Sequence, residues 1–373
     1  MFFKQKKNGE VTLVIDIGSS SVGAALVLIS KEVVPKIFFS TRLHIALQNE
    51  SEKSRSLTAV TTALESVIKT VAAEHSVIHK THIFFSSPWY FSETKIIKNE
   101  YDSPTLITHH TIDQITKESE RKFVENSKSS GEIVEHRIIR TRLNGYDTSN
   151  PYNKKAKKVE VTFFASMVAK DVLESVRRII AKHFRVHRDD VSSFALAAFN
   201  SISGILPSER DYLIVDIRGD VTDVSLITDG ALIKSVSFPQ GKNNLIQNVA
   251  NNSGQSQSAA LSLIKVAFHN DSDPGVKIDV QKNAEKFKQV WLELYAKTLQ
   301  EITGGGADVI LPQTIFLMAD SDIDMFFENI GNEIKNNGDI RSLRHLNFRD
   351  YVETSSVPTD SFLALESIFV TMI

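Results

Sequence analysis

The sequence of 373 residues contains no cysteine and carries almost no excess charge. The missing thiols exclude disulfide bonds, thiol nucleophiles and a cysteine-based zinc site, and a chain without disulfides fits a reducing cytosol. The 43 basic and 45 acidic residues give a formal net charge of −2. No overall positive field attracts nucleic acid, so we expect no nucleic-acid partner.

Long apolar runs are missing as well. No run approaches the roughly 20 residues that a membrane-spanning helix needs. The start of the chain, Met1 to Lys7, is charged and has no apolar stretch of the kind found in a secretory signal. The 11 histidines show no H-E-x-x-H spacing, and no ordered set of Ser, His and Asp stands out. We expect a cytoplasmic protein, and neither a metalloenzyme nor a hydrolase of these types.

Two stretches about 200 residues apart share one pattern: an apolar strand, an aspartate, a small polar turn and a second strand. The first stretch runs from Val11 to Ile29 and contains Asp16, Gly18, Ser19 and Ser20. A turn of small residues lets the backbone approach a ligand closely, with N–H groups and hydroxyls directed at it. Asp16 ends a buried strand, where its carboxylate suits a hydrated divalent cation. This stretch predicts a phosphate-holding hairpin.

The second stretch runs from Tyr212 to Ile227. Its polar residues are Asp216, Gly219, Thr222 and Asp223. Two copies of the pattern predict two similar lobes whose acidic hairpins face a common cleft. Gly241, between a strand and a helix, would let a phosphate approach the helix N-terminus. Each aspartate could instead cap its own turn, but the pair together with Gly241 favours the cleft.

The paired hairpins resemble the two phosphate hairpins of the actin-like ATPase superfamily, and the order of segments resembles the bacterial FtsA and PilM group over nearly the whole chain. The resemblance implies an α/β protein with a two-lobed actin-like (ribonuclease H-like) ATPase fold and a small α+β insert in the first lobe. It divides the chain into residues 1–83 and 187–210 for the first lobe, 84–186 for the insert, 211–357 for the second lobe, and 358–373 for a C-terminal helix that closes back on the first lobe.

The resemblance also implies ligands. In nucleotide-bound relatives, the aspartates that match Asp16 and Asp216 hold water around Mg²⁺ beside the β- and γ-phosphates, so ATP and Mg²⁺ are the expected cofactors. Of the family's Glu-x-x-Lys pair on the adenosine-contacting helix, only Lys265 is present, because Ser262 stands at the glutamate position.

Further departures indicate a weakened nucleotide site. Arg218 and Asp220 replace two glycines of the second hairpin. Asp220 would repel phosphate oxygens, whereas Arg218 could pair with them. The glycine pair expected after the strand that ends at Met318 is also missing, and residues 303–307, which are rich in glycine, follow a helix and are expected to end it. At most a weak ATPase is expected.

Three functions follow from the resemblance. The first is a scaffold of cell division that joins a tubulin-like division GTPase to the membrane and self-associates through the 84–186 insert. The alternative is a PilM-like component of a type IV pilus or related secretion system, which binds a short tail of an inner-membrane protein. The third is a small-molecule kinase of the same fold, which the altered motifs disfavour. The first two imply a location at the inner face of the cell membrane through partners.

Overall fold

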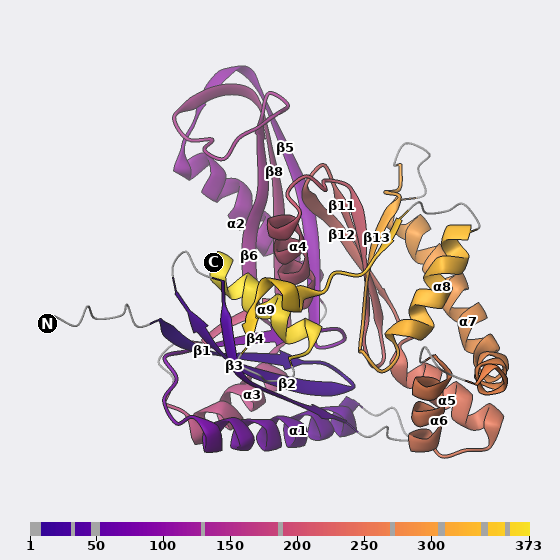
Figure 1. The fold of residues 1–373 in the computed structure, drawn as a ribbon. Helices are drawn as coiled ribbons and strands as arrows, with labels where there is room; N and C mark the ends of the chain where they lie inside the picture. The colour runs from indigo at the N-terminus through magenta and orange to yellow at the C-terminus, as the bar shows by residue number, and fades with distance from the viewer. Residues whose placement is uncertain are drawn as a thin grey trace, which may run out of the picture.

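The computed structural model describes residues 9–30, 34–45, 53–127, 131–185, 189–268, 273–304, 310–336, 342–354 and 359–373. Within these residues the strands form sheets of six, five and four strands (Figure 1). Helices cover the sheets, which confirms the predicted α/β class.

The six-stranded sheet is the centre of the first lobe, and its order is β15-β3-β2-β1-β4-β9. The strands β1 and β2 form the predicted first hairpin, and β4 and β9 pair in parallel beside β1. The bounds are β1 Glu10–Ile17, β2 Ser21–Ile29, β3 Lys36–His44, β4 Lys80–Phe85, β9 Asp189–Ser193 and β15 Glu353–Thr354.

The five-stranded sheet is the centre of the second lobe, and its order is β12-β11-β10-β13-β14. The strands β10 and β11 form the predicted second hairpin, with β13 and β14 parallel beside β10. The bounds are β10 Tyr212–Ile217, β11 Thr222–Thr228, β12 Ala231–Phe238, β13 Thr314–Ala319 and β14 Ser342–Arg344. The order and directions repeat those of β3-β2-β1-β4-β9, so the two-lobe repeat inferred from the hairpins is present.

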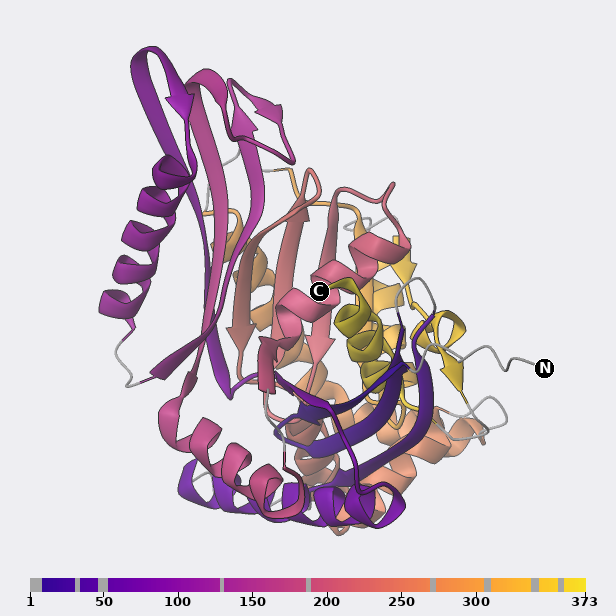
Figure 2. The ribbon, with the colours of Figure 1, turned by 90° about the vertical axis from the view of Figure 1, so that its left-hand side faces the viewer.

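Both sheets are buried on two faces, because their central strands contain continuous apolar runs in which successive side chains point to opposite faces. In β1, Leu13 and Ile15 face one core while Val14 faces another. The first of these cores contains α1 Lys53–Glu74 and α3 Lys170–His183, which lie beneath the sheet (Figure 2). On the far side of the second lobe, the core is closed by α5 Lys242–Ser253, α6 Gln257–Ala267, α7 Pro274–Ile302 and α8 Asp324–Asn336.

A central layer of two helices lies between the lobes. It consists of α4 Phe194–Ile205 and α9 Ser361–Met372, and its core continues into both sheets, from Val14 and Phe84 to Ile214 and Phe316. The short helix η1 Phe348–Tyr351 leads toward this layer and adds Phe348 to the same core. The lobes therefore share one continuous apolar core in addition to any contact at a cleft.

The four-stranded sheet, with the order β5-β8-β6-β7, stands beside the second lobe, and one helix covers its face (Figures 1 and 2). The bounds are β5 Tyr90–Ile107, α2 His109–Asn126, β6 Gly131–Leu143, β7 Tyr146–Asp147 and β8 Lys154–Ala169. The helix α3 follows β8 but packs on α1 of the first lobe. It had been assigned to the insert because sequence periodicity does not show which sheet an amphipathic helix covers. We propose that the insert comprises residues 90–169.

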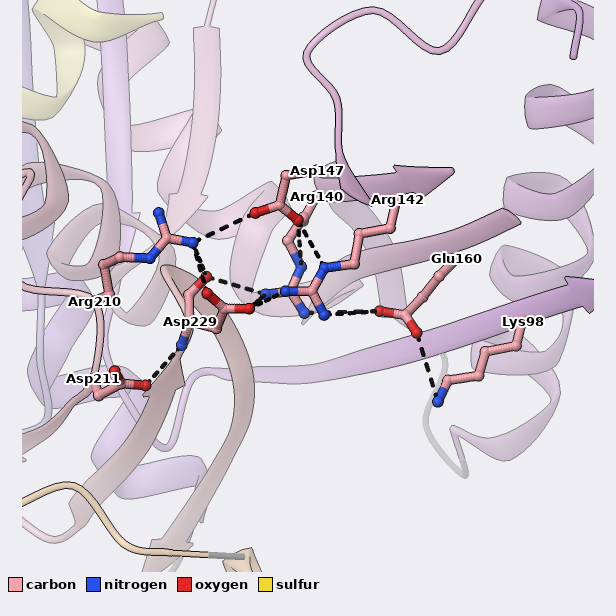
Figure 3. Close-up of polar contacts among 8 residues, drawn as sticks. All are labelled: Lys98, Arg140, Arg142, Asp147, Glu160, Arg210, Asp211 and Asp229. Atoms are coloured by element: carbon pink, nitrogen blue, oxygen red, sulfur yellow. Dashed lines mark hydrogen bonds and ion pairs between the residues drawn. The ribbon is translucent and has the colours of Figure 1, made fainter. Parts of the chain in front are cut away.

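The insert is also held by the second lobe, through a cluster of ion pairs (Figure 3). Arg140 and Arg142 of β6 both bind Asp229, which lies in the turn between β11 and β12. Arg210 joins Asp229 to Asp147 of β7, at 2.7 and 3.4 Å. These side chains are partly exposed, so each pair contributes about 1 kcal/mol or less. Together they link the insert to the turn between β11 and β12 of the second lobe.

The burial of His82 in β4 should make the free energy of unfolding decrease at acidic pH. His82 is buried, stacks on Phe84 and shares a 2.9 Å hydrogen bond with Ser192. Burial lowers the pKa of His82 from 6.5 to about 3. In the unfolded chain His82 binds a proton near pH 6.5, whereas in the folded chain it binds one only near pH 3. The free energy of unfolding therefore falls as the pH drops from about 6.5 to about 3.

Between about pH 7 and pH 4.5, native protein should lose about 2.5 kcal/mol more than the His82→Gln variant, which cannot titrate there. Urea denaturation of both proteins at both pH values measures this difference, and all other titrating groups cancel in the comparison. Equal losses in the two proteins would contradict the prediction.

Candidate interlobe site

Asp16 and Asp216 lie at equivalent places in the two lobes, and both side chains are directed into the central layer. Asp16 shares the face of β1 that carries Val14, and Asp216 shares the face of β10 that carries Ile214. Both residues are buried, with 0% and 3% exposure. The structure therefore brings the two predicted carboxylates into one region, as the paired hairpins indicated.

Arg218 compensates both carboxylates. It leaves the turn after β10, and its Nε donates to Asp216 at 3.0 Å while its Nη1 donates to Asp16 at 3.3 Å. Its guanidinium lies 4.0 and 3.6 Å from the ring centres of Phe194 in α4 and Phe362 in α9. Arg218 is only 3% exposed. The side chain that the sequence suggested as a partner for phosphate is thus already bound to protein carboxylates and aromatic rings.

Asp16 has a second cation and a neighbouring acid. Arg42 of β3 donates to Asp16 at 2.7 Å and bridges to Asp360 at 2.8 Å. Burial would raise the pKa of Asp16, but the charges of Arg218 and Arg42 outweigh it and hold that pKa below its usual value. Burial and the charge of Asp16 raise the pKa of Glu366 in α9 well above its ordinary range. This direction favours the neutral, protonated form of Glu366.

The second hairpin is tied to its own surroundings. Burial raises the pKa of Asp216 to about 7, more than Arg218 lowers it. The hydroxyl of Thr222 donates to the carbonyl of Gln240 at 2.6 Å and accepts from Trp291 at 3.1 Å. Asp223 accepts from Ser237 at 2.6 Å and from Tyr90 of the insert at 3.4 Å. Thr222 and Asp223 thus have structural partners in place of the predicted phosphate.

A further buried cation, Lys242, lies at the start of α5. Lys242, the first residue of α5, donates to Asp320 at 3.0 Å and to Asp322 at 2.7 Å. Lys242 lowers the pKa of Asp320 to about 2, against the opposing effect of burial. Lys265, predicted to contact adenosine, is half-exposed and reaches Asp322 at 3.6 Å. The turn that lacks the expected glycines therefore serves as the anion partner of Lys242.

Gly241 allows a close approach of protein backbone, rather than of a phosphate group. A Cβ on Gly241 would lie 2.4 Å from the carbonyl oxygen of Arg218 and 2.6 Å from that of Gly219. The first N–H groups of α5 donate to these two carbonyls, from Lys242 at 2.8 Å and from Asn243 at 2.7 Å. The helix N-terminus that Gly241 was predicted to open to phosphate is occupied by the turn of the second hairpin.

The two hairpin turns are also in direct contact. Gly18 donates to the carbonyl of Ser21 at 3.0 Å, which closes the first turn. Ser19 accepts from the N–H of Asp220 at 3.0 Å, and Ser20 donates to Asp320 at 3.4 Å. A Cβ on Gly219 would lie 2.7 Å from the backbone nitrogen of Ser20. No room for a phosphate group is left between Ser20 and Gly219.

These residues do not fit ATP and Mg²⁺. A phosphate needs free N–H donors, and those of Lys242 and Asn243 are used. A hydrated Mg²⁺ needs uncompensated carboxylate oxygens, whereas Asp16 and Asp216 already share Arg218. In the part of the chain that the structure describes, no group of three or more His, Cys, Asp or Glu side chains is arranged to hold a metal ion.

Sequence reasoning missed several members of this site. Arg42, Lys242 and Glu366 were not identified, although Glu366 is the one charged residue between Ser361 and Met372. A charged side chain on a helix that is otherwise apolar is costly to bury without a partner, and that conflict was the available signal. Arg42 and Lys242 carried no comparable signal, because their partners lie far away in the chain.

The comparisons with known proteins agree with the two-lobed architecture. No family model matches the chain, and no curated protein matches it in sequence. Among solved structures, the PilM–PilN type IV pilus biogenesis complex matches with a TM-score of 0.66 at 11% identity, covering 97% of both chains. The ethanolamine utilization protein EutJ from Carboxydothermus hydrogenoformans matches with a TM-score of 0.48 at 10% identity, covering 97% of this chain and 89% of that one. The pSK41 ParM protein gives 0.42 at 9% identity, with 98% and 97% covered.

The likeness to the PilM–PilN structure extends over nearly all of both chains, and it includes the duplicated sheets and the insert. At this identity it establishes the fold and leaves the activity open. The chain has the two-lobed actin-like ATPase fold that its paired hairpins and the order of its segments predicted.

Proposed function

We propose that this chain is a PilM-like scaffold of a type IV pilus or related secretion system, which binds a short segment of an inner-membrane protein from the cytoplasmic side. The observation that carries the proposal is the structural match to a PilM–PilN complex over 97% of both chains. This reverses the order given by the sequence, which placed cell division first, because the hairpins and the insert are common to both groups.

The interlobe site supports a scaffold in preference to an enzyme. A kinase or efficient ATPase needs an accessible phosphate site, whereas Asp16, Asp216 and Arg218 are buried and paired with one another. None of the described helices is long and apolar enough to cross a bilayer. Recruitment to the membrane through a partner is therefore part of the proposal.

The insert offers a groove for such a partner. A cavity of about 520 Å³ lies between α2 and β5, with Ile97, Tyr101 and Ile115 among its lining residues. In the sheet order β5-β8-β6-β7, β5 is an edge strand. An extended chain segment can add to an edge strand through main-chain hydrogen bonds, with its side chains in a neighbouring groove. We place the contact with the inner-membrane protein here.

Affinity capture of the tagged protein from its own cells, read by mass spectrometry, tests the function. Recovery of a single-span inner-membrane protein together with a pilus motor ATPase is expected. Recovery of a tubulin-like division GTPase with division proteins would overturn the pilus assignment in favour of cell division.

A pair of variants then tests the groove with the captured membrane protein's cytoplasmic segment as a peptide. Gln114 lines the groove, whereas Lys117, one turn further along α2, is exposed outside it. Gln114→Trp fills the groove and should weaken binding at least tenfold in calorimetric titration, while Lys117→Trp should leave it unchanged. Equal effects of both variants would place the contact elsewhere.

A further inference from the structure

Arg218 belongs to the second lobe but is bound mainly by groups outside it. Its guanidinium lies between Phe194 and Phe362 of the central helices and pairs with Asp16 on the central strand of the first lobe. Within its own lobe it keeps one partner, Asp216. All four partners and Arg218 itself are buried. A separation of the lobes at this point would leave charges uncompensated in an apolar layer.

Two more hydrogen bonds join the two lobes beside Arg218. Ser19 accepts from the N–H of Asp220, and Ser20 donates to Asp320, whose carboxylate is held by Lys242. Gly219 touches Ser20 so closely that a Cβ would not fit between them. The crossing contacts therefore involve backbone and short polar side chains as well as the ion pair, and they leave no gap between the two turns.

We propose that Arg218 is a built-in latch, which takes the place of nucleotide and Mg²⁺ between the lobes and holds them in one fixed orientation. The guanidinium supplies Asp16 and Asp216 with the positive charge that a bound cation would otherwise bring. Lys242 does the same for Asp320 and Asp322. Lobe orientation is then a permanent property of the fold, so the surfaces shown to partners do not depend on nucleotide. This inference stands independently of which partner the protein binds.

The absence of cysteine allows a direct test, because two introduced cysteines are the only sites for spin labels. Lys69→Cys on α1 and Val266→Cys on α6 place one label on each lobe at exposed positions. Double electron–electron resonance (DEER) then measures the distance between the two labels, and so between the lobes, in the full chain. We expect one narrow distance distribution that is the same without nucleotide, with Mg-ATP and with Mg-ADP, and no saturable binding of either nucleotide by calorimetry at millimolar concentration.

The latch itself is tested by Arg218→Met in the labelled protein, which should broaden the distribution toward longer distances. Lys80→Met is the matched control, because Lys80 pairs with Asp190 at 2.5 Å entirely within the first lobe. It should leave the distribution unchanged.

Three results would overturn the proposal: a shift of the native distribution with Mg-ATP, saturable binding of Mg-ATP by the native chain, or an unchanged distribution in a folded Arg218→Met variant. If that variant does not fold, the measurements on native protein still decide whether nucleotide controls the lobes. Failure of this test would not affect the partner capture described above, so the two proposals fail separately.

Discussion

Arg218→Met should lower the free energy of unfolding by about 3–5 kcal/mol, the cost of leaving buried charges without a partner. The substitution keeps an apolar side chain between Phe194 and Phe362 but removes the cation shared by Asp16 and Asp216. Arg42 still pairs with Asp16, whereas Asp216 loses the cation that lowered its pKa and, because burial already raises that pKa to about 7, takes up a proton. Urea denaturation of the native and variant proteins measures the effect.

Two further variants separate this electrostatic cause from a packing defect. Asp216→Asn added to Arg218→Met supplies a side chain that is neutral without taking up a proton, and it should recover part of the loss. Arg121 of α2 also binds two carboxylates, on Glu118 and Glu125, but on the surface. Arg121→Met should therefore have little effect on the free energy of unfolding. A loss in Arg218→Met no larger than in Arg121→Met would show that the interlobe network does not stabilise the fold.

Gly241→Ala should destabilise the protein by about 2–3 kcal/mol through overpacking. The new methyl group would lie 2.4 Å from one backbone carbonyl oxygen and 2.6 Å from another, on the turn of the second hairpin. Neither carbonyl can rotate away, because each accepts a hydrogen bond from the first turn of α5. The φ of Gly241 is −146°, which any residue adopts, so the whole effect comes from contact. Thermal or urea denaturation measures it.

Gly275→Ala is the control for this prediction. Gly275 lies in the first turn of α7, where a Cβ would meet only a side-chain oxygen of Asp273 at 3.0 Å. Alanine favours a helix over glycine, so Gly275→Ala should be neutral or slightly stabilising. A neutral Gly241→Ala would mean that the helix and the hairpin turn are free to separate, and would argue against a closed interlobe site.

The repeated strand–aspartate–turn pattern predicted the two lobes correctly because strand register is local. Alternation along β1 and β10 determines which side chains face each side of the sheet, and two short apolar runs with a polar turn between them form a hairpin wherever they occur. The same pattern placed Asp16 and Asp216 at equivalent positions in both lobes. The fold and the convergence of the two carboxylates could therefore be predicted from the chain.

The assignment of α3 and the partners of the buried side chains in the interlobe site could not be predicted from the sequence. The amphipathic face of α3 fits either the insert or the first lobe, and only packing on α1 distinguishes them. The sequence showed that Arg218 and Asp220 replace glycines, but whether Arg218 binds phosphate or protein depends on partners such as Asp16, 202 residues away.

By itself, the sequence determined the duplicated α/β fold and showed the altered residues in the nucleotide motifs, because these depend on local periodicity and residue type. The tertiary structure decided what replaces the nucleotide. Arg42 meets Asp16 within the first lobe and Lys242 meets Asp320 within the second, whereas Arg218 meets Asp16 only when the two lobes come together. The sign and strength of a buried ion pair depend on those long-range distances and on the exclusion of water, which the order of residues does not specify.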